Sequence, residues 1–199
     1  MNKSNHNFRG VIFRVALTGI CAATIEAVKV AFEVIPNVEG ISLFTALFGY
    51  SFGSVGIYSS IIFCFIEILR HGAGYPAWII LYFTYWPFLA AAFMLLRKIK
   101  VKNRIVITGV AVVMTLWFSF YSVLLDACYL YAGSNYPFWI IFGERFLSGI
   151  WWFVIQTVCN AVLFPLLFRP LSNLLLGIER QFFPNRKKSE KGLDKTDEI

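Results

Sequence analysis

Long runs of apolar residues alternate with short polar segments along almost the whole chain. A helix needs about 20 apolar residues to cross the hydrocarbon core of a bilayer. Four apolar blocks reach roughly this length, and the longest has room for two crossings. The blocks are Val11–Val34, Ile41–Leu69, Trp78–Leu96 and Ile105–Phe168. With 58% hydrophobic residues against a soluble norm of about 45–50%, the pattern predicts an all-α integral membrane protein.

Segments rich in proline and glycine divide the four blocks into six predicted helices. Residues 36–40, Gly53, residues 71–76 and residues 133–137 supply the breakers. The predicted helices are Val11–Glu33, Ile41–Tyr50, Val55–Arg70, Trp78–Leu96, Ile105–Tyr131 and Phe146–Phe168. The second and third are short for full crossings, and such helices occur where they line a protein cavity rather than lipid. We therefore expect a bundle of six transmembrane helices.

Positive charge gathers in a few polar segments and predicts the orientation of the bundle. Of the 18 Lys and Arg residues, all but Lys29, Arg70 and Arg145 lie in three clusters. Cytoplasmic loops of membrane proteins are enriched in Lys and Arg. The segments predicted to be cytoplasmic are residues 1–10, 97–104 and 169–199. Both chain ends then lie on the same side of the membrane, which requires an even number of crossings.

The domain organisation follows from the same polar segments. A short cytoplasmic N-terminus of residues 1–10 precedes one membrane domain, residues 11–175. Residues 176–199 form a tail that is first basic and then acidic, a composition typical of disordered segments. No other stretch is long and polar enough for a soluble domain.

Several classes of chemistry are disfavoured by the residues present. The chain has no G-x-x-x-x-G-K-[ST] phosphate-binding sequence, so an ATP-driven activity requires an ATPase on another chain. Its four Cys lie in apolar blocks without C-x-x-C spacing, and it has only two His. This argues against zinc, di-iron and haem sites. We expect neither a metal nor a cofactor.

A membrane enzyme and a stand-alone secondary transporter or channel are the alternatives of a different class. Neither a G-x-S-x-G nor an H-E-x-x-H sequence occurs, although His71 near Glu67 is a possible acid–base pair. Secondary transporters typically contain internal repeats, and the halves of this chain show none. We therefore expect a protein that is not an enzyme.

Small residues recur every four positions along the first predicted helix. The row consists of Gly19, Ala23, Ala27 and Ala31. Rows of this kind allow two helix backbones to approach closely in a membrane. The row either packs inside the bundle or offers a smooth face to another membrane subunit.

Aromatic side chains gather near the predicted outer turns. The group consists of Tyr75, Trp78, Tyr82, Tyr85, Trp86, Tyr129, Tyr131, Tyr136, Trp139, Trp151 and Trp152. An interfacial belt should occupy both faces of the membrane, whereas few Trp or Tyr lie near the predicted inner face. The asymmetry favours an aromatic-lined cavity that opens outward.

Polar residues inside apolar helices are the other candidates for ligand binding, because they are costly in a membrane unless paired or functional. Glu26 with Lys29, and Glu67 with Arg70, have i,i+3 spacing and can neutralise each other. Gln156 and Asn160 share a helix face and either bond to another helix or form a cavity floor. The predicted ligand-binding residues are Asn37, Glu67, Tyr82, Trp86, Asp126, Asn135, Trp152, Gln156 and Asn160.

Three local stretches resemble one family of membrane proteins. The first is Pro36-Asn37-Val38-Glu39, and the second is Glu67 followed by Gly72-Ala73-Gly74, Trp78, Tyr82 and Tyr85-Trp86-Pro87. The third is Ser148-Gly149-Ile150 with Asn160 and the apolar residues after it. Over residues 11 to 175 the chain is similar to the substrate-binding S component of energy-coupling factor (ECF) vitamin transporters.

The resemblance implies a function and partners. An S component of the prokaryotic cell membrane binds a vitamin from outside, and then docks through its first helix onto a transmembrane coupling subunit that carries two ATPases. ATP-driven toppling of the S component then exposes the ligand to the cytoplasm. The ligand remains open: many aromatics suit a cobalamin, whereas Arg70 or Arg145 with Asn135 suits a small carboxylate such as pantothenate.

Overall fold

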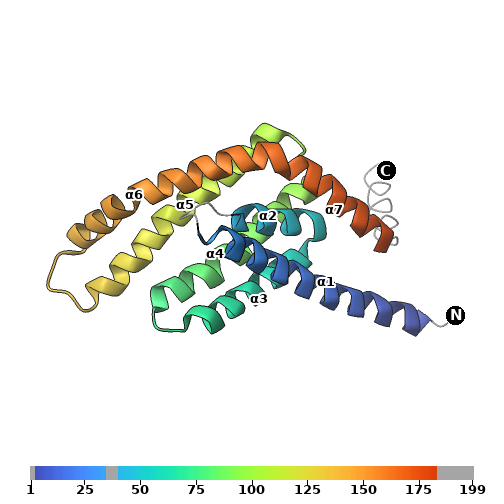
Figure 1. Ribbon diagram of the computed structural model, residues 1–199, viewed down its shortest axis with the longest axis horizontal. Helices are drawn as coiled ribbons and strands as arrows, with labels where there is room; N and C mark the ends of the chain where they lie inside the picture. The colour runs from blue at the N-terminus through green and yellow to red at the C-terminus, as the bar shows by residue number, and fades with distance from the viewer. Residues whose placement is uncertain (1–2, 35–39, 183–199) are drawn as a thin grey trace, which may run out of the picture.

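The computed structural model describes residues 3–34 and 40–182, with side chains from residue 10 onward, and these residues form helices joined by short turns (Figure 1). The helices are α1 (Lys3–Phe32), α2 (Ile41–Phe52), α3 (Ser54–His71), α4 (Pro76–Lys98), α5 (Arg104–Tyr131), α6 (Phe138–Leu163), the π-helical turn η1 (Phe164–Phe168) and α7 (Arg169–Phe182). The predicted all-α class is therefore confirmed for the described part of the chain. Asn37 lies outside the described residues.

Within the described part of the chain, five helical stretches are long and apolar enough to cross a membrane. They are Gly10–Phe32, Ser54–His71, Pro76–Lys98, Arg104–Tyr131 and Phe138–Phe182. Many large apolar side chains on these helices face outward, as lipid contact requires. With the shorter apolar helix α2, they form a multi-pass helical bundle.

The short helix α2 lies at the centre of the bundle, and every one of its residues except Phe44 is buried. It packs against α3 and α4, and two glycines permit this close approach. A Cβ on Gly49 would collide with the backbone of Ala90 in α4, and one on Gly56 would collide with the backbone of Gly49. Gly53, with a φ of 66°, reverses the chain between α2 and α3.

Helices α5 and α6 pack against each other as a long hairpin (Figure 1). The sequence predicted that the last crossing begins at Phe146, but α6 begins at Phe138, because Glu144 and Arg145 belong to the helix and not to the preceding turn. The helical path then bends at η1, where Pro165 has no backbone N–H to donate to the helical ladder. Among the residues of α6, only Ile141, Gln156 and Asn160 are buried.

The predicted tail also needs correction, because α7 continues the helical path through residues 176–182. Arg97 of α4 holds this helix: its Nη2 donates to Glu179 Oε2 at 2.5 Å. Its Nη1 also donates to the carbonyls of Tyr50 and Ser51 at the end of α2. These last helical carbonyls have no partner within their own helix, so one guanidinium satisfies them and anchors α7. The remainder of the predicted tail, residues 183–199, lies outside the described residues.

The basic segments of the chain meet at one end of the bundle. Arg169 at the start of α7 donates to the carbonyl of Lys102 in the α4–α5 turn at 2.6 Å. Phe13 in the N-terminal half of α1 stacks on Phe182 at 4.3 Å between ring centroids. We call this the basic end. The turns after α3 and α5 lie at the opposite end, which we call the aromatic end (Figure 1).

The contact between α2 and α4 generates a stability prediction. Gly49→Ala should lower the free energy of unfolding by about 1–3 kcal/mol, because the added methyl group meets backbone that cannot rotate away. The matched control is Gly109→Ala on α5, where a Cβ has no neighbour within 4 Å. Unfolding of both variants in detergent, followed by circular dichroism, tests the difference. Equal stability of the two would contradict the tight α2–α4 contact.

Candidate ligand cavity and ion-pair cluster

An ion-pair cluster joins α1 to α3 near the aromatic end. Its central residue is Glu67 of α3, whose side chain has 0% exposure and forms an ion pair with Lys29 of α1. Arg70 Nη1 lies 3.3 Å from Glu67 Oε1 and 2.7 Å from Glu26 Oε1. Arg70 Nη2 lies 3.0 Å from Glu33 Oε2. One arginine thus bridges three carboxylates, from α1, from the turn that follows it and from α3.

The ion pairs differ from the two i,i+3 pairs, Glu26 with Lys29 and Glu67 with Arg70, that the sequence spacing suggested. The i,i+3 contact between Glu67 and Arg70 is present, but Lys29 pairs with Glu67 and Glu26 pairs with Arg70, so both pairs join α1 to α3. At the exposed edge, the hydrogen bond and the positive charge of Arg70 hold the pKa of Glu33 below its usual value. A buried carboxylate is stable in an apolar bundle only when it is paired. We therefore assign Glu67 to holding α1 on α3.

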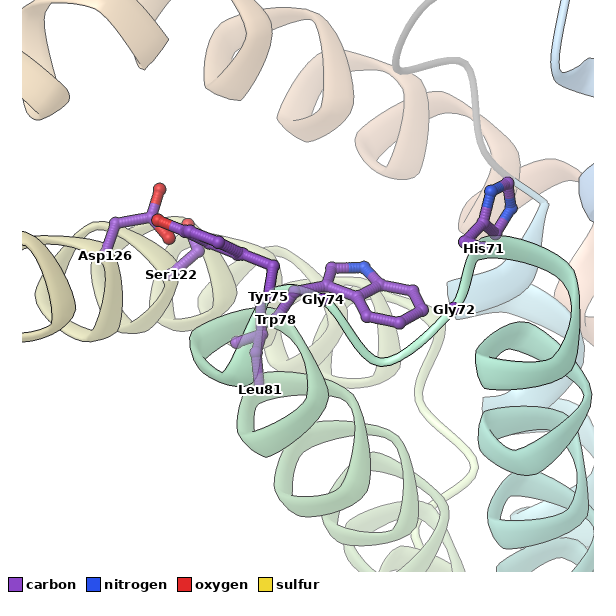
Figure 2. A pocket seen from close by; sticks show the side chains of 8 residues that line it. All are labelled: His71, Gly72, Gly74, Tyr75, Trp78, Leu81, Ser122 and Asp126. Atoms are coloured by element: carbon purple, nitrogen blue, oxygen red, sulfur yellow. The ribbon is translucent and has the colours of Figure 1, made fainter.

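A cavity of about 460 Å³ lies at the aromatic end beside this cluster. Its walls come from the α3–α4 turn, the first turns of α4 and the last turns of α5. The lining residues are His71, Gly72, Gly74, Tyr75, Trp78, Leu81, Ser122 and Asp126 (Figure 2). The cavity thus combines two aromatic rings with a few polar groups, the usual composition of a small-molecule site.

Tyr75 and Asp126 lie next to each other in the wall of the cavity (Figure 2). The phenol of Tyr75 points from the α3–α4 turn toward the Asp126 carboxylate on α5 (Figure 2). Burial raises the pKa of Tyr75, and the negative charge of Asp126 and the hydrogen bond to it raise this pKa further. The phenol is therefore a neutral hydrogen-bond donor at physiological pH. The Tyr75 ring also packs edge-on against Tyr129, with centroids 4.8 Å apart.

Trp78 forms the aromatic wall between the cavity and the bundle interior. Its ring lies 4.4 Å from that of Tyr82, between centroids, and 6.2 Å from the imidazole of His71. His71 Nε2 in turn lies 3.9 Å from Glu67 Oε1. Lys29 Nζ lies 5.6 Å from the centroid of the Tyr82 ring. The cavity wall and the ion-pair cluster are therefore in direct contact.

Of the eight predicted ligand-binding residues that the structure describes, Asp126 is the one that lines this cavity. Tyr82 and Trp86 are buried, and Trp86 has 0% exposure. Trp86 packs between Tyr85 and Phe118, at centroid distances of 5.0 and 5.6 Å, as part of the apolar core. Periodicity alone does not separate such core aromatics from cavity aromatics, because both repeat along the same helix.

The other predicted ligand-binding residues lie at different places. Asn160 Nδ2 donates to Thr115 Oγ1 at 2.9 Å, so this amide joins α6 to α5. Gln156, one turn earlier, is also buried, whereas Asn135 and Trp152 are exposed on the α5–α6 hairpin. Of the cavity residues that the prediction omitted, all but Ser122 lie between His71 and Leu81, in the α3–α4 turn and the helix turns on either side of it. The sequence signal for them was the pair of aromatics that follows the glycines within four residues, Tyr75 and Trp78.

The small-residue row of α1 faces outward. Gly19, Ala23, Ala27 and Ala31 are all exposed, and a Cβ on Gly19 would have no neighbour within 4 Å. The opposite face of α1 packs into the bundle through Leu17, Cys21, Ala22 and Ile25. Of the two readings of the row, packing inside the described bundle is therefore excluded.

Comparisons with protein-family models, with curated proteins and with solved structures find no match to this chain. Within residues 3–34 and 40–182, no group of three or more His, Cys, Asp or Glu side chains is placed to hold a metal ion.

The buried ion pair generates a second stability prediction. Lys29→Met should lower the free energy of unfolding by about 3–5 kcal/mol, because it leaves the buried Glu67 carboxylate undercompensated. The double variant Lys29→Met/Glu67→Gln should regain most of this loss, because it removes both charges. Denaturing-detergent titrations of the parent, both single variants and the double variant measure the coupling.

The control for this cycle is Lys98→Met, which removes a positive charge from an exposed position at the basic end. It should leave the unfolding midpoint close to that of the parent. Additive effects of Lys29→Met and Glu67→Gln would show that the two side chains do not depend on each other.

Proposed function

We propose that this chain is the substrate-binding S component of an ECF transporter that imports a vitamin or related micronutrient. The observation that carries the proposal is the combination of two features in one small bundle. A cavity with aromatic walls lies at the aromatic end, and a continuous row of small residues on α1 faces away from the bundle. The first feature suits capture of a small molecule, and the second suits close contact with another membrane helix.

The distribution of positive charge gives the proposed orientation. The basic end, with the α4–α5 turn and α7, lies on the cytoplasmic side of a prokaryotic cell membrane. The aromatic end and its cavity then open outward. Both chain ends are cytoplasmic in this arrangement, and α2 contributes the short second crossing.

The proposed cycle assigns separate tasks to the two features. The micronutrient binds from outside at the aromatic end. The α1 face then docks onto a transmembrane coupling subunit, which associates with two ATPase subunits that supply the energy. The chain itself has no phosphate-binding loop, so it contributes specificity and leaves ATP hydrolysis to its partners.

The orientation is testable with cysteine labelling in intact cells. Cys128 and Cys159 are first replaced by Ala, since Cys21 and Cys64 are buried and protected. A membrane-impermeant maleimide should then modify Ser134→Cys at the aromatic end and leave Lys102→Cys at the basic end unmodified. Lys102 is preferred to Asn103, because the Asn103 side chain caps α5. Labelling of Lys102→Cys from outside would reverse the proposed orientation.

The docking face is testable with a bulky substitution. Ala27→Trp should abolish uptake of the micronutrient by cells while leaving ligand binding by the purified chain intact, because a large side chain separates the two helices. Val113→Trp on α5, where the parent side chain is 64% exposed, is the control and should preserve both activities. Equal loss of uptake in the two variants would mean that the α1 row has no special role.

A further inference from the structure

We infer that the cavity takes a small heteroaromatic ligand that carries a positive charge, with Asp126 as its counter-ion. This inference rests on the proposed function, since it assumes that the cavity is the ligand site of the chain, and it narrows the class of micronutrient. A cobalamin and pantothenate, the two ligands that composition left open, both fit the site poorly.

The charge of the residues that line the cavity is the first reason to expect a cationic ligand. Among its lining residues, Asp126 is the one acidic side chain, and Tyr75 and Ser122 add hydroxyls. The imidazole of His71 lies at the other end of the cavity, 3.9 Å from Glu67 Oε1 (Figure 2). The nearest cations of the ion-pair cluster, Lys29 and Arg70, are bound to carboxylates of that cluster. The walls therefore favour a ligand that brings its own positive charge.

Arg145 of α6 lies outside the ion-pair cluster and also acts on this site. Its charge interacts with Asp126 and Tyr75, but its side chain is not part of the cavity lining. A ligand in the cavity meets the Asp126 carboxylate directly, whereas Arg145 acts over a longer distance. The local preference for a cation therefore remains.

The aromatic walls also favour a cationic ligand, through a second kind of interaction. The faces of Tyr75 and Trp78 carry negative quadrupole potential, which attracts cations, and they stack on flat rings. A heteroaromatic cation uses the stacking and the electrostatic attraction together. An acyclic carboxylate such as pantothenate gains neither, and Asp126 repels it.

The volume of the cavity limits the size of the ligand. Its volume of about 460 Å³ lies in the lower part of the range of about 300–1,000 Å³ typical of sites for drug-sized ligands. A corrin ring with its nucleotide is much larger than a drug-sized molecule. The cavity has room for one or two small rings with a short substituent.

Equilibrium binding to the purified full chain in detergent tests this inference. The first pair of probes is 1-methylnicotinamide, a cation, and nicotinamide, its neutral counterpart of nearly the same shape. The second set is thiamine, pantothenate and cyanocobalamin, which represent a heteroaromatic cation, an anion and a large corrin. We expect each cation to bind at least tenfold more tightly than its uncharged, anionic or larger competitors. Failure of both cations to bind, or binding without preference for charge, would overturn the inference.

Two variants test whether Asp126 is the residue that makes the cavity prefer cations. Asp126→Asn keeps the volume and an acceptor for the Tyr75 hydroxyl, and should weaken binding of the better cation at least tenfold. Glu144→Gln removes the same charge from an exposed position on α6 and should leave binding unchanged. Unfolding midpoints verify that both variants fold. Should Asp126→Asn not fold, the comparison between charged and neutral probes on the parent chain still decides the question.

Co-purification with ATPase subunits separates this inference from the proposed function. A chain that associates with ATPases but binds pantothenate or cyanocobalamin in preference to the cations would overturn the inference alone. A chain that binds the cations in an Asp126-dependent way but never associates with ATPases would support the cation site and overturn the proposed function.

Discussion

A carboxylate with no exposed surface, Glu67, is the constraint on which the aromatic end of the molecule depends. In an apolar bundle its charge requires partners, and Lys29 of α1 and Arg70 of α3 supply them. Because Lys29 comes from another helix, neutralising Glu67 also sets the rotation of α1 about its axis. The face with Cys21 and Ile25 turns inward, and the small-residue row consequently turns outward. The same ion pair places the start of the α3–α4 turn, which forms a wall of the cavity.

The aromatic residues divide into two layers with different roles. Trp86 lies in the inner layer, fully buried and packed against neighbouring rings. Trp78 and Tyr75, further toward the aromatic end, form the outer layer and line the cavity. Tyr82 lies between the layers, in contact with both Trp78 and Trp86. This continuity gives the cavity a rigid base, because the rings beneath it belong to the core of the bundle.

Helix α1 connects the two regions to which the proposed function assigns binding and docking. Its C-terminal turns carry Lys29, which contacts Glu67 and lies over the Tyr82 ring beneath the cavity. Its outer face carries the small-residue row from Gly19 to Ala31. A ligand that moves the α3–α4 turn would therefore act on the cluster that holds α1. Under the proposed function, this is a physical route by which an occupied cavity is sensed at the docking face.

Sequence alone determined the membrane class, the approximate position of the helices and the gathering of basic segments. These properties depend on local quantities: the length of an apolar run, the presence of proline or glycine, and the charge of a turn. Tertiary structure decided which helix pairs with Glu67, which tryptophan is core and which lines a cavity, and which face of α1 is free. Each of these depends on neighbours far away in the chain. Asn160 and Trp86 show this. A polar amide or a large ring in a membrane helix suits a ligand site as well as a contact between helices. Only the partner against which each side chain packs distinguishes the two roles.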